Sequence, residues 1–140
     1  MAKKSHSIFI RSYGLSDVGL VRPNNEDYWS QEKDLALYAL ADGMGGHSAG
    51  EVAAKGAVCH FMSIMRDALE EEGVDFTPEI VKKLLKYVTR QVNQIIHKKS
   101  LENKKLKGMG TTFCAMHFFE ENAAAFIHVG DSRIYRLRKG

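Results

Sequence analysis

The 140 residues are enough for one domain with a modest hydrophobic core. A hydrophobic content of 44% and a charged content of 26% are ordinary for a soluble globular chain. The formal net charge of +3 is too small to imply a nucleic acid or another polyanion as partner.

The first part of the chain predicts two strands and a polar loop between them. Residues 8–15 read as the first strand, residues 16–25 as the loop, and Tyr28 to Ser30 as the second strand. Lys3 and Lys4 precede only a short apolar cluster, which is not a signal peptide. We therefore expect a cytoplasmic protein. Its two cysteines, Cys59 and Cys114, are predicted to be buried free thiols.

The stretch from Leu35 to Gly50 is the most informative part of the sequence. An apolar run over residues 35–41 predicts a buried strand and is too short to span a membrane. Asp42 follows it, in front of a glycine-rich loop, and Ser48 with Glu51 forms a capping box that starts a helix over residues 48–72. A carboxylate, free carbonyls and unpaired N–H groups would meet there, which suits metal and phosphate. The alternative is a tight turn capped by Asp42.

A second acidic pair lies just before the neighbouring strand. Glu26 and Asp27 precede residues 28–30, and a short turn joins that strand to the central one. In a hairpin, the start of one strand lies beside the end of the other. We therefore expect Glu26 and Asp42 at the same edge of the sheet.

The second half of the chain predicts one long helix followed by strands. Thr77 and Pro78 are the N-cap and first residue of this helix. Three strands follow, over residues 111–119, 123–129 and 132–137, after a polar loop over residues 100–107. The predicted apolar stripe of the helix is Val81, Leu84, Leu85, Val88, Val92 and Ile95. Strands, two helices and then more strands indicate an α+β fold with antiparallel sheets.

Basic side chains are concentrated between Lys82 and Lys107, where nine Lys or Arg residues and the single acid Glu102 give a local net charge of +8. A solvated helix face explains this better than a nucleic-acid surface, because only Tyr87 interrupts the basic run and stacking aromatics are missing. A basic module that binds polyanions is retained as an alternative.

Four segments in this order carry a resemblance to a known family: RPNNED (Arg22 to Asp27), ADGMGG (Ala41 to Gly46), GMGTT (Gly108 to Thr112) and GDSR (Gly130 to Arg133). Together they resemble the PP2C-type, metal-dependent serine/threonine protein phosphatases of the bacterial branch. The resemblance covers residues 14–137. It implies an antiparallel β-sandwich flanked by helices, of which residues 1–140 would form one partial domain without the C-terminal part.

The resemblance also implies a mechanism and a set of roles. Two Mn²⁺ or Mg²⁺ ions, or three, would activate a water for attack on phosphoserine or phosphothreonine of protein substrates. Asp42 would bridge two metals, the Gly43 carbonyl would bind one of them, and Glu26 would bind the other. Asp27 and Asp131 would be further ligands or would hold metal-bound water. Arg22 would grip the substrate phosphate, a role that suits its planar charged fork.

Two departures from the family pattern stand out. Met44 follows the Asp-Gly pair, where some members carry a histidine, and His47 is interpreted as a loop residue. The family domain also continues past GDSR with further strands and two later aspartate motifs. A truncated, non-catalytic fragment that binds metal weakly or pairs with a partner is therefore the alternative to an enzyme. The expected partners are phosphorylated proteins and an opposing serine/threonine kinase, with no nucleic acid and no membrane.

Overall fold

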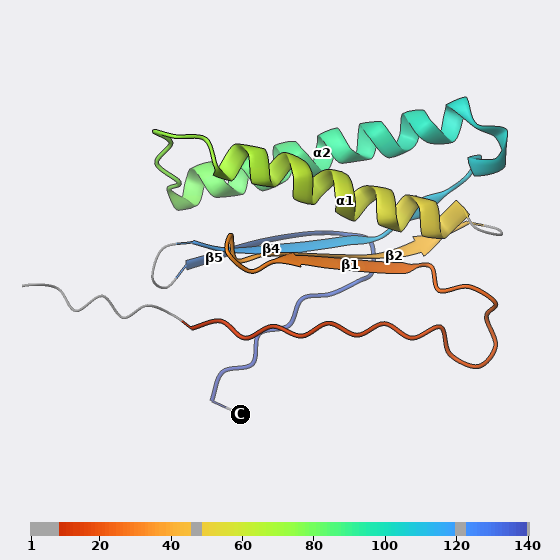
Figure 1. Cartoon of the computed structure of the whole chain (residues 1–140), viewed down its shortest axis with the longest axis horizontal. Coiled ribbons are helices and arrows are strands. Elements are labelled where there is room, and N and C mark those ends of the chain that lie inside the picture. Colours follow the sequence, from red (N-terminus) through yellow and green to blue (C-terminus); the bar gives the residue numbers. More distant parts are fainter. Residues whose placement is uncertain (1–8, 46–48, 120–122, 140) are drawn as a thin grey trace, which may run out of the picture.

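Two helices cover one face of a single antiparallel sheet in the computed structural model, which describes residues 9–45, 49–119 and 123–139 (Figure 1). The elements are β1 (Asp27–Glu32), β2 (Leu37–Met44), α1 (Ala49–Leu69), α2 (Pro78–Glu102), the 3₁₀ helix η1 (Lys104–Leu106), β3 (Gly110–Thr111), β4 (Phe113–Phe119) and β5 (Ala123–Val129). The strand order is β1-β2-β4-β5, and β3 pairs with β2. The predicted α+β fold with antiparallel pairing is confirmed for these residues.

The side chains of β2 alternate between the two faces of the sheet. Along β2, Leu37, Ala39 and Ala41 are buried under the helices, and the residues between them are less buried. The predicted central strand therefore exists, but it begins two residues later than expected and includes Asp42 and Gly43.

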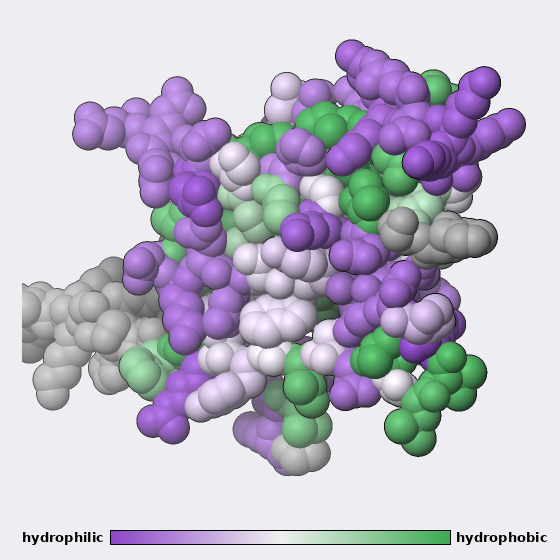
Figure 2. Space-filling view, turned by 45° about the vertical axis from the view of Figure 1, so that its right-hand side comes forward, coloured by the Kyte–Doolittle hydropathy of each residue, from purple (hydrophilic) through white to green (hydrophobic). Residues whose placement is uncertain are grey.

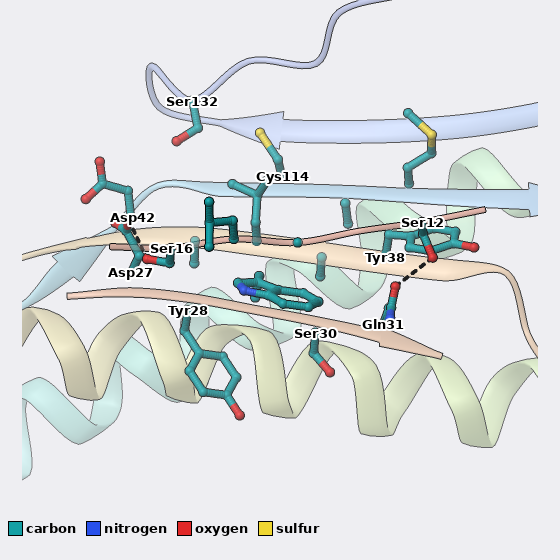
Figure 3. A pocket seen from close by; sticks show the side chains of 18 of the residues that line it. Ser12, Ser16, Asp27, Tyr28, Ser30, Gln31, Tyr38, Asp42, Cys114 and Ser132 are labelled. Carbon is teal, nitrogen blue, oxygen red and sulfur yellow. Dashed lines mark hydrogen bonds between the residues drawn. The ribbon is translucent and has the colours of Figure 1, made fainter. Parts of the chain in front are cut away.

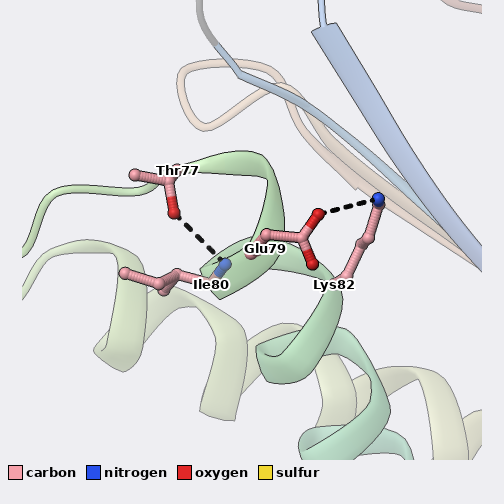
Figure 4. A network of polar contacts seen from close by, with 4 residues as sticks. All are labelled: Thr77, Glu79, Ile80 and Lys82. Atoms are coloured by element: carbon pink, nitrogen blue, oxygen red, sulfur yellow. Dashed lines mark hydrogen bonds and ion pairs between the residues drawn. The ribbon is translucent and has the colours of Figure 1, made fainter.

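Helix α2 begins where the sequence predicts. Figure 4 shows the Thr77 side chain accepting a hydrogen bond from the backbone N–H of Ile80, at 3.4 Å, and Glu79 pairing with Lys82 at 3.2 Å. The predicted apolar stripe is buried at Val81, Leu85, Val88 and Val92, and its last buried member is Ile96 rather than Ile95. The helix runs to Glu102, so the predicted loop over residues 100–107 starts later and contains η1.

The core lies between the helices and the sheet. The Phe61 ring on α1 packs on the Phe113 ring of β4, with their centroids 4.8 Å apart. The largest fully buried side chains are Phe61, Leu37, Met65, Leu85, Val58, Val81, Val88 and Cys114. Cys114 is thus buried as predicted, whereas Cys59 is exposed. Cys59 follows the buried Val58 by one residue, a rotation of about 100° that turns it away from the core.

The sheet face away from the helices is crossed by extended chain rather than by further strands. Residues 9–15 and 132–137 run along this side without strand pairing, so the strands predicted there are wrong (Figure 1). Most of their large side chains are exposed, for example Tyr13 at 92% and Leu137 at 86%, and Ile10 and Ile134 are half-buried. A strand needs a neighbour for its backbone N–H and C=O groups, and the described residues provide none for these segments.

Three predictions fall outside the described residues: the capping role of Ser48, the loop position of His47 and the connection over residues 120–122 between two predicted strands. Neither described helix has the length and apolar character that a membrane crossing requires.

Candidate metal and phosphate site

The β1–β2 hairpin gathers the acidic residues at one edge of the sheet. Asp27 is the register partner of Asp42, and the backbone N–H of Gly43 donates to the backbone oxygen of Glu26 at 3.0 Å. The hairpin therefore places Glu26 beside the end of β2, which is the arrangement that the sequence predicts.

An open pocket of about 560 Å³ lies at this edge. Five of the six predicted site residues line it: Arg22, Glu26, Asp42, Gly43 and Asp131. The sixth, Asp27, lines a second pocket of about 570 Å³ on the sheet face away from the helices. Asp42 borders both pockets, and Figure 3 shows it next to Asp27 at one end of the second pocket.

Two glycines let the end of β2 touch the start of α1. A Cβ on Gly43 would overlap the backbone oxygen of Gly50 and would lie 2.7 Å from the backbone oxygen of Glu26. A Cβ on Gly50 would lie 2.8 Å from a carboxylate oxygen of Glu26. The absence of both side chains leaves room for the Glu26 carboxylate beside the first turn of α1, where the helix dipole favours negative charge.

The GMGTT segment holds the backbone of Asp42 in place. The Thr112 hydroxyl accepts from the Asp42 N–H at 3.0 Å, and the Thr112 N–H donates to the Asp42 carbonyl at 2.9 Å. Thr111 adds a third bond, from its hydroxyl to the same carbonyl, at 3.0 Å. The sequence pattern marks this segment but predicts no role for it. Its contact with Asp42 could not be predicted, because the two lie about 70 residues apart in the chain.

The GDSR turn is tied to the same threonine. The hydroxyls of Thr112 and Ser132 lie 2.6 Å apart, and Gly130 has a φ of +92° that brings the turn against the Thr112 side chain. These contacts bring Asp131 to the pocket from the far end of the chain.

The electrostatics show that the acidic groups crowd one another. The pKa of Asp42 is raised, chiefly by burial and then by the neighbouring Asp27, and Asp131 adds to the increase while Arg22 opposes it. A cation between these carboxylates would relieve the repulsion.

The donor set fits a hard divalent ion in kind, because it consists of carboxylate and carbonyl oxygens. The number of donors is small, however. Within residues 9–45, 49–119 and 123–139, no group of three His, Cys, Asp or Glu side chains is arranged to hold a metal ion. Met44 borders the pocket and is 63% exposed, and His47 lies outside the described residues.

Comparisons with known proteins agree with this geometry. Residues 22–140 match the family model for protein phosphatase 2C. The serine/threonine protein phosphatase PstP of Mycobacterium tuberculosis is 40% identical over 134 residues, which cover 96% of this chain and 24% of the relative. The protein phosphatase PhpP of Streptococcus pneumoniae is 35% identical over 127 residues, which cover 89% of this chain and 49% of the relative.

A solved structure supports the same assignment. The catalytic domain of the serine/threonine protein phosphatase PstP in complex with two manganese ions aligns with a TM-score of 0.69 and 39% identity, over 85% of this chain and 47% of that domain. The chain thus spans about half of this solved domain and half or less of the curated relatives. The family match and the shared fold lead to one conclusion: this chain belongs to the protein phosphatase 2C family.

Proposed function

We propose that residues 1–140 form part of a phosphatase domain that hydrolyses phosphoserine and phosphothreonine on protein substrates. The observation that carries this proposal is the shared pocket of Arg22 with the carboxylates Glu26, Asp42 and Asp131. The permanently charged Arg22 next to clustered carboxylate oxygens suits the binding of a phosphate monoester beside divalent metal ions.

Each residue has a proposed role in the complete domain. Asp42, Glu26 and the Gly43 carbonyl would hold the Mn²⁺ or Mg²⁺ ions, because their oxygens line one pocket. Asp27 and Asp131 would complete the shell or hold its waters, Asp131 at a third ion if one is present. When bound, such ions lower the pKa of water to produce a nucleophile near neutral pH and neutralise the phosphate oxygens.

The chain's own residues would orient the substrate. Arg22 would bind the phosphate by donating two parallel N–H hydrogen bonds to its oxygens, which fixes the orientation of the phosphate as well as its position. The bonds from Thr111 and Thr112 to the backbone of Asp42 would hold its carboxylate in one place. Met44 has no proton to donate, so the leaving oxygen would take its proton from water.

The proposed substrates define the partners. A phosphatase of this class acts on proteins that a serine/threonine kinase has phosphorylated, so such a kinase would oppose it. The cytoplasmic location stays a prediction from the sequence, as does the lack of a nucleic-acid or membrane partner.

A second candidate is a non-catalytic unit that binds metal weakly. It is favoured by the lack of a three-ligand group among the described residues. For that reason we assign full activity to the complete family domain and expect little from these 140 residues alone.

The test compares two aspartate variants in an extended domain, which joins this chain to the remaining portion of the PstP catalytic domain. Asp42→Ala should abolish manganese-dependent release of p-nitrophenol from p-nitrophenyl phosphate, with the fold intact by circular dichroism. Asp67→Ala is the matched control, because Asp67 is an exposed acid in the last turns of α1. Near-native activity of the Asp42 variant would refute the proposal.

A further inference from the structure

The connection between α2 and β3 carries three lysines, Lys104, Lys105 and Lys107, which we call the lysine rim. We propose that the lysine rim docks acidic residues that flank the phosphorylated residue of a protein substrate. This inference rests on the proposed function, because it takes the pocket beside the rim as the place where the phosphate binds.

The lysine rim belongs to the connection that reaches that pocket through Met109 and Gly110. A Cβ on Gly45, which lines the pocket, would be 3.2 Å from the α-carbon of Met109, and Gly110 is the register partner of Met44. Lys107 precedes Met109 by two residues, which span at most about 7 Å. Figure 1 shows the α2–β3 connection at the same end of the molecule as the start of α1 and the loop before β1.

The rim is anchored to the core. Leu106 and Met109 are buried at 9% and 8% exposure, on either side of Lys107. The side chain of Asn103 accepts from the N–H of Lys105 at 3.0 Å. An anchored turn loses little backbone entropy when a partner binds, so its charges are well placed for recognition.

The charges of the rim are available to a partner. All three lysines are exposed, and none of them pairs with an acidic group in the described part of the chain. The nearest acid in sequence, Glu102, already pairs with Lys98 at 3.7 Å. Figure 2, in which this end of the molecule is turned forward, shows hydrophilic side chains projecting from the helical layer.

Charge complementarity identifies the occupant. The pocket already requires a substrate with a negative phosphate, and positive charges beside it favour further negative charge on the same peptide. Acidic residues of the helical layer at this end, such as Glu51 in the first turn of α1, would repel such a peptide and direct it towards the rim. Exposed ion pairs are individually weak, so three of them should together give about a tenfold preference.

The test measures peptide binding to the 140-residue chain in 1 mM MnCl₂ by fluorescence anisotropy. Three labelled peptides are compared: a phosphoserine peptide flanked by glutamates, the same peptide flanked by glutamines, and the glutamate peptide without phosphate. We expect the acidic phosphopeptide to bind about tenfold more tightly than the neutral one at low salt, with the preference lost at high salt.

Two triple variants locate the effect. K104A/K105A/K107A should remove the preference for glutamate flanks. K82A/K83A/K86A removes the same charge from the other end of α2, at least about 24 Å along the helix, and should preserve the preference. An equal loss in both variants, or no preference in the native chain, would overturn the docking inference. A phosphate-independent affinity with the preference intact would instead contradict the phosphate pocket and leave the rim supported.

Discussion

The contact between β2 and α1 at Gly43 gives a stringent test of the site's architecture. Gly43 has no positive φ, so alanine would fit its backbone conformation, and in open space the change would stabilise the fold by about 0.4–1 kcal/mol. Here a Cβ would overlap the Gly50 carbonyl oxygen and would approach the Glu26 carbonyl oxygen to 2.7 Å. Because both obstacles are backbone atoms, the strand and the helix must separate for alanine to fit.

The magnitude follows from this geometry. Overpacking in a well-packed region costs about 1–3 kcal/mol, and rigid backbone on both sides indicates the upper end of that range, about 3 kcal/mol. For a chain of this size, that corresponds to a decrease of about 10 °C in the melting temperature. In the extended domain, Gly43→Ala should also weaken manganese binding, because the Glu26 carboxylate is displaced.

The assay is thermal and urea unfolding followed by the fluorescence of Trp29, the single tryptophan, which lies in β1 beside the site. Gly56→Ala in α1 is the matched control. A Cβ there meets only the terminal methyl of Ile96, at 2.9 Å, and alanine is the better helix former by about 1 kcal/mol. Equal stability of the native chain and Gly43→Ala would refute the claim that this contact is rigid.

Four further predictions concern the substrate, the core, a buried histidine and metal binding. Arg22→Ala in the extended domain should raise KM by about 10- to 150-fold, since one charge-assisted contact is worth about 1.5–3 kcal/mol; an unchanged KM in steady-state kinetics would remove Arg22 from the phosphate site. Phe61→Ala should cost about 3–5 kcal/mol in urea unfolding, because the ring is fully buried against Phe113; a loss below 1 kcal/mol would contradict this packing. Burial lowers the pKa of His117, so the unfolded chain takes up its proton first, and stability should fall as the pH drops below about 6.5; His117→Gln should flatten this dependence in acid unfolding. Calorimetric titration of the 140-residue chain should give millimolar manganese affinity, and tight binding of two ions would show that the described ligands suffice.

Local signals in the sequence predicted much of the fold. The Thr77–Pro78 cap and the apolar period after it predicted α2, and the apolar run over residues 35–41 predicted β2, because helix starts and short buried strands depend on near neighbours. Local signals failed for residues 9–15 and 132–137, whose strand character requires a pairing partner that the described residues do not provide. They also failed for Cys59, because the exact phase of a helix against the core is set by packing.

The candidate site divides in the same way. The sequence by itself determined the residue types, their order and the hairpin that brings Glu26 to Asp42. A short turn between two antiparallel strands places the start of one strand and the end of the other at the same edge of the sheet. Only the tertiary structure decided that Thr112 holds the backbone of Asp42 from about 70 residues away and that Asp131 reaches the same pocket. The tertiary structure also decided that Asp27 lines a second pocket, because residues 12–16, which complete that pocket, come from a segment that the fold lays across the sheet.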